Sequence, residues 1–356
     1  MAENNPRKTP ARQFRNRNAR NGLFWRGGAS PMATMIGLHA AFGQPVQAAQ
    51  MGCKVTRGIV DMRTAMATYA SDDDLLANAL PAYVNVYRNN MILCGCLRYS
   101  DSVDDSTDNW PTTGSAEGIR LLGLLTKLAT LTDSQQGGTS NFTASQLGSR
   151  LWVQFGNEIQ SGPGEIPDDG GSPTKKAKYI SFIQSAITTI RAANANVKIV
   201  GPGIQTTTHL STPDGSLTAQ QAYRKNIVLD AYAEDFDLLD VHMHVETAAE
   251  VNTLHSEATT AITGYDVVAL EWSAANYWVA NPAGSQATAV AISRNAWLNM
   301  NAKNMLAACY GPFVSGASQP AQFQEIALTN YSGGGRRDPY YPMYTEIART
   351  SAGLPY

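Results

Sequence analysis

The sequence predicts an α/β protein, a (β/α)8 or TIM barrel preceded by a basic, extended N-terminal arm. Between residues 30 and 356, eight short apolar runs rich in β-formers alternate with segments of helical periodicity, which is the pattern of a parallel sheet. Two of these runs end in a glutamate, and residues 1–29 contain seven Lys and Arg against one acid. We therefore expect an arm over residues 1–29 and a barrel over residues 30–356.

The predicted strands follow one another with a helix between most neighbours. The clearest helix begins at Ser172 and Pro173, and its apolar residues recur at helical spacing as far as Ile190. The expected strands are residues 34–39, 54–57, 91–99, 151–158, 197–201, 238–244, 266–271 and 305–310. The other expected helices are residues 45–51, 73–88, 116–131, 219–232, 248–262 and 287–301.

Eight strands that alternate with helices close into a barrel more naturally than they form an open sheet. A doubly wound sheet is the alternative, and its nucleotide-binding members carry G-x-G-x-x-G after an early strand. The sequence has no such turn, and its glycine run at residues 333–335 comes too late. The barrel is therefore the predicted fold.

The composition is that of an ordinary globular enzyme. Apolar residues make up 43% and charged residues 16% of the chain, and the net charge of −2 gives no general attraction to nucleic acid or membrane. No apolar run is long enough to span a membrane. Residues 34–49 are interrupted by Gln44, Pro45 and Gln47, so we expect no secretion signal and leave the location open. The four cysteines lack zinc-site spacing and are expected in the core.

Two strand ends carry candidate catalytic groups: Asn157-Glu158 after the fourth strand and Glu271 after the seventh. Carboxylates at the C-terminal ends of barrel strands lie on the face where barrel enzymes have their active sites. Either glutamate alone could be a solvated residue or the partner of a nearby arginine. Together they predict a pair of carboxylates that hydrolyses glycosidic bonds.

Over residues 31–350 these strand ends resemble those of clan A, the large clan of retaining (β/α)8 glycosidases. The resemblance implies that Glu158 is the general acid/base and Glu271 the nucleophile. It also implies that Asn157 hydrogen-bonds the sugar 2-hydroxyl and that Arg57, at the end of strand two, binds the nucleophile. The motifs are short, so the resemblance is to the clan and not to one family.

Strand six carries His242 and His244, and it departs from the clan at His244. Alternation sends both side chains to one face, and many clan members have a tyrosine at the second position, where it touches the nucleophile. We expect His244 to take over this contact with Glu271. Metal-dependent barrel hydrolases also use His-x-His pairs, but on strand one and with later histidine ligands. Here only His255 follows, so hydrogen-bonding histidines are favoured, and no metal or cofactor is expected.

Several further residues are candidates for sugar contact. Tyr310 lies on strand eight, where the clan has a tryptophan platform. Trp110, Trp272 and Trp278 are either core residues or sugar-stacking residues. His39 ends strand one and is either a satisfied rim histidine or a sugar contact.

The loops after strands three, four and eight are long and rich in Gly, Asp and aromatic residues. The loop at residues 100–113 has four aspartates, but it lacks the ligand alternation of a calcium loop and is expected to face substrate. Such loops predict an open cleft for a β-linked polymer. The first hypothesis is therefore a retaining β-glycosidase or endo-glycanase. The alternatives are a non-catalytic carbohydrate-binding or structural virion protein and a metal-dependent hydrolase.

The N-terminal segment cannot bury enough apolar surface to fold alone. It is either a disordered, solubilising tail or an arm that docks on an acidic protein surface or on nucleic acid in a larger assembly. Its seven cations, spread among Asn and Pro, resemble the basic arms of virion structural proteins. This resemblance suggests that the barrel is displayed on a phage particle.

Overall fold

The computed structural model describes most of the barrel unit, which comprises Ala33–Tyr356. The arm predicted over residues 1–29 lies outside the described residues. The structure describes residues 34–39, 45–79, 89–99, 110–131, 148–160, 166, 174–205, 207, 209–311, 314–315, 329–330 and 340–351.

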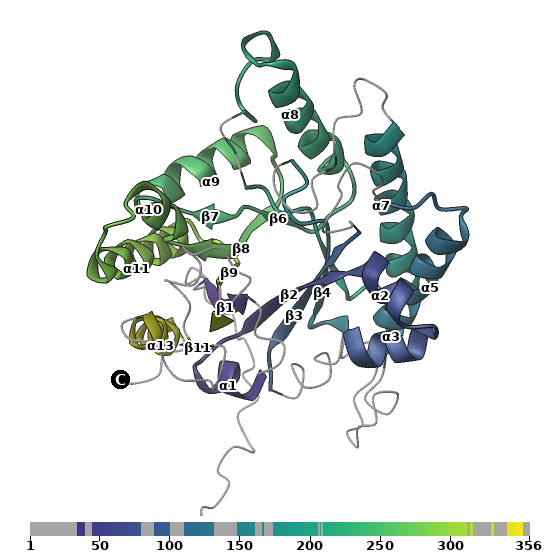
Figure 1. Ribbon diagram of the computed structural model, residues 1–356, viewed down its shortest axis with the longest axis horizontal. Helices are drawn as coiled ribbons and strands as arrows, with labels where there is room; N and C mark the ends of the chain where they lie inside the picture. Colours follow the sequence, from purple (N-terminus) through teal and green to yellow (C-terminus); the bar gives the residue numbers. More distant parts are fainter. Residues whose placement is uncertain are drawn as a thin grey trace, which may run out of the picture. The chain divides into compact units, whose positions relative to one another are not determined.

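Parallel strands close into a barrel (Figure 1), which confirms the predicted fold class. The strands are β1 Met35–His39, β2 Val55–Asp61, β3 Ile92–Arg98, β4 Leu151–Phe155, β5 Lys198–Val200, β6 Leu238–Asp240, β7 Met243–His244, β8 Asp266–Ser273 and β9 Ala307–Tyr310. Pairing runs from β1 through β6 in order, then from β6 to β8, β9 and back to β1. β7 pairs with β8, so β6 and β7 together fill the sixth strand position. A separate two-stranded sheet pairs β10 Val314–Ser315 with β11 Thr329–Asn330.

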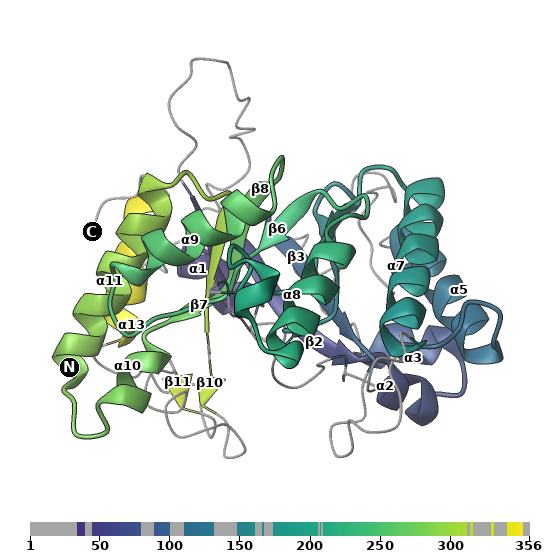
Figure 2. The same ribbon diagram turned by 90° about the horizontal axis from the view of Figure 1, so that it is seen from above.

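Helices surround the barrel, as Figures 1 and 2 show. They are α1 Pro45–Gln50, α2 Met62–Thr68, α3 Asp72–Ala79, α5 Ala116–Thr130, α7 Thr174–Ala193, α8 Ala219–Ala231, α9 Glu250–Ala261, α10 Ala275–Ala280, α11 Gln286–Ala302 and α13 Tyr340–Ser351. Among the described residues, no helix is both long and apolar enough to cross a membrane.

Apolar side chains pack on both faces of the strands because successive residues point to opposite sides. One cluster fills the barrel interior and includes Val55, Cys94, Trp152, Val268 and Cys309. A larger cluster joins the outer faces of the strands to the helices. All four cysteines are buried, as expected of small core residues.

A one-residue shift in β8 determines which way Glu271 faces. Ala269 pairs with Ala308, whereas Trp272 pairs with Tyr310, so β8 has one residue more than β9 between these pairs. Leu270 belongs to the interior cluster, and strict alternation would turn Glu271 outward. The extra residue, a β-bulge, lets Leu270 and Glu271 both face inward and turns Trp272 toward the outer layer.

Some element boundaries differ from those predicted. β2 continues past Arg57 to Asp61 because it keeps pairing with β3 as far as Arg98. Asp61 then caps α2, accepting a hydrogen bond from the backbone nitrogen of Thr64 at 3.0 Å. The sixth strand is interrupted between β6 and β7. The helix predicted over residues 73–88 is observed as α3, and residues 80–88 lie outside the described part of the chain.

Gly37 in β1 should tolerate no side chain. A Cβ atom there would lie 2.5 Å from Sγ of Cys309 and 2.6 Å from the carbonyl oxygen of Val55. We expect Gly37→Ala to lower the free energy of unfolding by about 1–3 kcal/mol, the usual cost of overpacking. Gly123→Ala is the control, because that exposed position in α5 is open and alanine should stabilise the helix by about 0.5–1 kcal/mol. The free energies of unfolding would be measured in urea. A change in the same direction for both variants would contradict this packing.

Candidate active site

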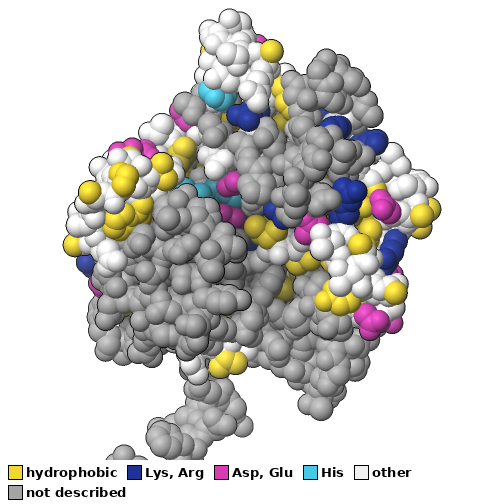
Figure 3. Space-filling view, viewed as in Figure 1, with side chains coloured by type: hydrophobic (Ala, Val, Ile, Leu, Met, Phe, Trp, Pro, Cys, Tyr) yellow, Lys and Arg dark blue, Asp and Glu magenta, His cyan; other side chains and the backbone are white. Residues whose placement is uncertain are grey.

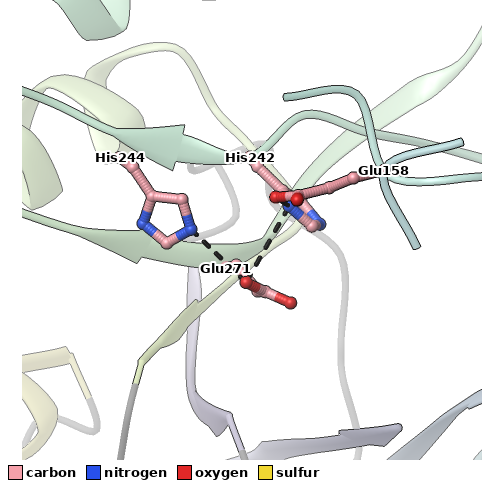
Figure 4. A group of neighbouring side chains, drawn as sticks. All are labelled: Glu158, His242, His244 and Glu271. Atoms are coloured by element: carbon pink, nitrogen blue, oxygen red, sulfur yellow. Dashed lines mark hydrogen bonds and ion pairs between the residues drawn. The ribbon is translucent and has the colours of Figure 1, made fainter. Parts of the chain in front are cut away.

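Four polar side chains meet at the C-terminal ends of the strands: Glu158, His242, His244 and Glu271. One oxygen or nitrogen of each lies within 4.8 Å of those of the other three. Figure 4 shows the two histidines and the two glutamates gathered around one point. In the space-filling view, acidic and histidine side chains lie together near the middle of the face that the helices enclose (Figure 3).

Glu158 follows β4 on a sharply turned piece of backbone. Its own φ is 50° and that of Gly156 is 89°, so a residue with a Cβ occupies the left-handed region, which costs of order 1 kcal/mol or more. The turn lifts Glu158 to the mouth of the barrel, where its side chain is 9% exposed. Strain at a functional position persists when the surrounding contacts hold it, and His242 provides such a contact.

Arg57 is completely buried inside the barrel, and its guanidinium is bound on three sides. Nε donates to Oε1 of Gln154 at 2.8 Å and Nη2 donates to Oδ1 of Asn157 at 2.7 Å. Nη1 donates to Oε1 of Glu271. Arg57 is therefore not at the end of its strand, as predicted, but in the third position of β2, and it reaches Glu271 from below. Asn157, expected at the sugar 2-hydroxyl, directs its carbonyl oxygen at Arg57.

His242 lies between three carboxylates. Its Nδ1 is 2.7 Å from Oε1 of Glu158 and 3.9 Å from Oε2 of Glu271. Its Nε2 is 3.2 Å from Oδ2 of Asp240, but these two atoms are not aligned as in a good hydrogen bond. Burial alone would lower the pKa of His242, but these carboxylates raise it to about 10. Since the ordinary value is 6.5, protonated His242 stabilises the fold fully below about pH 6.5, and this contribution is lost as the pH rises through about 10.

His244 contacts the other side of Glu271, as expected from the sequence. Its Nε2 is 3.3 Å from Oε2 of Glu271, and its Nδ1 is 2.9 Å from Oγ of Ser273. The backbone carbonyl of His244 accepts a hydrogen bond from the side chain of Asn276 at the start of α10. Both strand-six histidines thus face Glu271, as the alternation predicts.

Two buried polar residues beneath the cluster were missed by the sequence analysis: Gln154 and Asp240. The Nε2 atom of Gln154 donates to Oδ2 of Asp240 at 2.6 Å and to the carbonyl oxygen of Gly201 at 3.0 Å. The signal was available, because each is a polar residue inside an otherwise apolar strand, and such residues need buried partners.

Two predicted sugar contacts are in the core instead. Trp272 and Tyr310 are completely buried and pack against each other with ring centroids 4.9 Å apart. The Tyr310 ring also lies 5.9 Å from that of Tyr344 in α13, so this pair faces the helices and not the barrel mouth. Trp110 is likewise buried against Phe182 and other aromatic residues.

The remaining sugar-contact candidates are placed less fully. Trp278 is half-buried in α10, next to Tyr277. His39 ends β1 opposite Arg57 of β2, and its side chain lies outside the described part of the structure. Of the loops predicted to form an open cleft after strands three, four and eight, residues 100–109, 161–165, 167–173 and 316–328 also lie outside it.

The four clustered residues have the donor types of a metal site, but their geometry suits hydrogen bonds better. Zinc bonds of about 2.0–2.2 Å would bring tetrahedral ligands to roughly 3.5 Å from one another, whereas the spread here extends to 4.8 Å. Nδ1 of His242 lies only 2.7 Å from Oε1 of Glu158, which is a hydrogen-bond distance and shorter than the separation between two ligands of one zinc ion.

Several solved structures that share this fold are glycoside hydrolases. A glucosidase from Croceicoccus marinus superposes with a TM-score of 0.64 at 11% identity, covering 90% of this chain and 68% of its own. The GH53 catalytic domain from Ignisphaera aggregans gives 0.59 at 13% identity, covering 89% and 96%. A thermostable mutant of the xylanase Xyn10A from Cellvibrio japonicus gives 0.55 at 12% identity, covering 90% and 98%.

These likenesses confirm the predicted resemblance to clan A glycoside hydrolases at the level of the fold. The chain has a glycoside hydrolase-like barrel, and these likenesses resolve no family for it. No family model matches the chain, and no curated protein matches its sequence.

Because the backbone at Glu158 is left-handed, a glycine there should give a more stable protein than an alanine, the reverse of the usual order. We expect Glu158→Gly to unfold with a free energy about 1 kcal/mol higher than Glu158→Ala, because only glycine adopts this φ without strain. At Glu257 in α9 both replacements lose the same hydrogen bond to Thr207. There the alanine variant should have a free energy of unfolding about 1 kcal/mol higher than the glycine variant, because alanine favours the helix. The same order at both positions, measured by chemical denaturation, would show that Glu158 is unstrained.

Proposed function

We propose that the chain is a glycoside hydrolase that cleaves a β-linked polysaccharide with retention of configuration. The observation that carries this proposal is that carboxylate oxygens of Glu158 and Glu271 lie within 4.8 Å of each other at the barrel mouth. Retaining enzymes place their two carboxyl groups about 5–5.5 Å apart, whereas inverting enzymes need about 6.5–9.5 Å to admit water. The glucosidase, GH53 and xylanase structures that share the fold support the substrate class.

In the proposed mechanism Glu158 protonates the leaving glycosidic oxygen while Glu271 attacks the anomeric carbon and forms a covalent glycosyl-enzyme. Glu158 then takes a proton from a water molecule whose oxygen attacks the anomeric carbon, which breaks the bond to Glu271 and releases the sugar with its original configuration. Arg57 holds Glu271 ionised and oriented through its buried ion pair. Asn157 is proposed to contact the sugar 2-hydroxyl, together with its hydrogen bond to Arg57.

His244 is proposed to replace the clan's tyrosine as a hydrogen-bond donor to the nucleophile. Oγ of Ser273 accepts a hydrogen bond from the backbone nitrogen of Ala275 at 3.3 Å and can donate its own hydrogen to Nδ1 of His244, 2.9 Å away. With Nδ1 as the acceptor, Nε2 carries the ring hydrogen and can donate it to Glu271, 3.3 Å away.

Replacing the two glutamates should give two different kinds of loss. Glu158→Ala should keep activity on activated aryl glycosides, whose leaving groups need no acid, and azide should restore turnover by taking the vacated space. Glu271→Ala should lose activity on aryl glycosides and polysaccharides alike, by about 10⁴-fold or more. Rates would be measured on a panel of β-linked oligo- and polysaccharides, with exposed Glu246→Ala as the control. Loss of wild-type activity on treatment with a chelator would instead support a metal-dependent hydrolase.

A second candidate function is carbohydrate binding without turnover. The observation that favours it is the buried His242, whose Nδ1 lies 2.7 Å from Oε1 of Glu158. This contact occupies a carboxylate oxygen of the residue that would have to donate a proton to the leaving group. If the wild type and Glu271→Gln both bind a β-linked glycan and neither hydrolyses it, the protein is a carbohydrate-binding protein without turnover.

We also propose that residues 1–29 anchor the barrel to a larger assembly such as a phage particle, where it acts on host surface glycans. Support comes from the sequence of the arm, with seven cations and a single acid. Arms of this kind become ordered only when charge-assisted contacts to a partner offset the entropy of fixing them. An acidic protein surface or nucleic acid would supply those contacts.

Deleting residues 1–28 should separate anchoring from catalysis. We expect the truncated protein to retain full glycosidase activity and to lose co-sedimentation with the assembly. Co-sedimentation of the full-length protein should weaken as salt is raised from about 0.05 M to 0.5 M, because salt screens such contacts. A truncated protein that still co-sediments, or a full-length protein that is a free monomer in its native source, would rule out the anchoring.

A further inference from the structure

We propose that Asp240 is the positioning residue for both candidate catalytic carboxylates, and that it acts on them only through other groups. The inference rests on the proposed function and adds a residue that touches neither the substrate nor the reacting atoms. Asp240 ends β6, and its side chain is completely buried. A buried carboxylate is retained only where charged or hydrogen-bonding partners surround it.

The first connection runs to the backbone that carries Glu271. Oδ1 of Asp240 accepts a hydrogen bond from the backbone nitrogen of Leu270 at 2.8 Å. Leu270 immediately precedes Glu271, within the stretch where the register of β8 shifts. The regular ladder between β6 and β8 ends at Asp240 and Val268, so the side chain of Asp240 bonds the strand just beyond the point where backbone pairing stops. It therefore fixes the bulge that turns Glu271 inward.

The second connection runs to the side chain of Glu271 through two residues. Oδ2 of Asp240 accepts from Nε2 of Gln154 at 2.6 Å, and this bond orients the amide so that its oxygen accepts from Nε of Arg57. Arg57 in turn donates to Glu271. An amide turned the other way would set a donor against Arg57, so Asp240 selects the orientation of Gln154 that keeps the guanidinium in place.

The third connection runs to Glu158 through His242. Nε2 of His242 is 3.2 Å from Oδ2 of Asp240, and Nδ1 is 2.7 Å from Glu158. The ring has little freedom to move, because it packs closely against the backbone of Gly203. A Cβ atom added to Gly203 would lie only 2.4 Å from Nε2 of His242. The negative charge of Asp240 keeps a proton on the ring, and the high pKa of His242 agrees with this. Asp240 thus determines whether the His242 ring that faces Glu158 is protonated.

The titratable groups around Asp240 and His242 come from six strands or their ends and from the end of one helix. Among the described residues they are Arg57 of β2, Cys94 and Cys96 of β3, Glu158 after β4, His244 of β7, Glu271 of β8, Cys309 of β9 and Tyr232 after α8. Burial raises the pKa of Cys94, Cys96 and Cys309 and of Tyr232, so these stay neutral. The group that responds to loss of the Asp240 charge is therefore His242.

The test uses Asp240→Asn, His242→Gln and the double variant in the full-length protein. Asparagine keeps an acceptor for Leu270 but removes the charge and sets a donor against Gln154. We expect Asp240→Asn to lower kcat about tenfold or more through misplacement of the carboxylates, with KM nearly unchanged and the pH profile of kcat shifted. In the His242→Gln background the further loss should be smaller, because the connection to Glu158 is already broken.

Asp237→Asn is the matched control. Asp237 directly precedes β6, accepts a hydrogen bond from the backbone nitrogen of Ile199 at 2.7 Å and pairs with Arg191 at 3.2 Å. It therefore holds a neighbouring strand as Asp240 does, without a connection to the carboxylates. It should alter thermal stability but leave kcat and its pH profile as in the wild type. A similar fall in kcat for Asp240→Asn and Asp237→Asn would show that Asp240 has only a structural role.

A second measurement does not depend on turnover. Nitrogen-15 NMR of labelled histidines, with the His242 signal assigned from His242→Gln, should show the ring protonated well above pH 7 in the wild type and deprotonating at lower pH in Asp240→Asn. If the wild type hydrolyses no glycan, the proposed function fails while this titration still tests Asp240. If Asp240→Asn does not fold, the double variant, which removes both buried charges, should fold better. An unchanged His242 titration together with wild-type kcat in Asp240→Asn would overturn the proposal.

Discussion

A guanidinium buried inside the barrel constrains most of what surrounds it. Arg57 is 0% exposed, and a charge in that position costs several kcal/mol unless every donor finds an acceptor. Gln154, Asn157 and Glu271 supply those acceptors from two different strands. The arrangement divides the interior into an apolar lower part and a charged upper part. Because the acceptors include Glu271 and the neighbour of Glu158, satisfying Arg57 also places the candidate catalytic groups.

The barrel and the residues that converge at its mouth could be predicted from the sequence because both depend on local patterns. Strand and helix periodicities differ, and residues at the C-terminal ends of parallel strands gather at one face. Arg57, Glu158, His242, His244 and Glu271 accordingly came together as expected. Their chemical roles stay proposals, since a position shows what a side chain contacts and not what it catalyses.

Other features depend on tertiary packing and have no local signal. The outward turn of Trp272 toward Tyr310 follows from a pairing shift with β9, which no property of the residues of β8 alone reveals. The extension of β2 beyond Arg57 follows from continued pairing with β3. Gln154 and Asp240 gave a weak signal as polar residues within apolar strands. The contacts of Gln154 with Gly201 and with Asp240 join residues more than 45 positions apart in the chain and could not be inferred from it.

The extra residue in β8 also affects how this chain should be compared with others. Alternation of inward and outward residues is often the only similarity left between barrel strands at 12–14% identity. From Leu270 onward that alternation changes phase in this protein. An alignment that follows the apolar pattern of β8 without allowing a one-residue insertion would place Glu271 opposite an outward-facing position, and a carboxylate shared with a distant homologue would be scored as a mismatch.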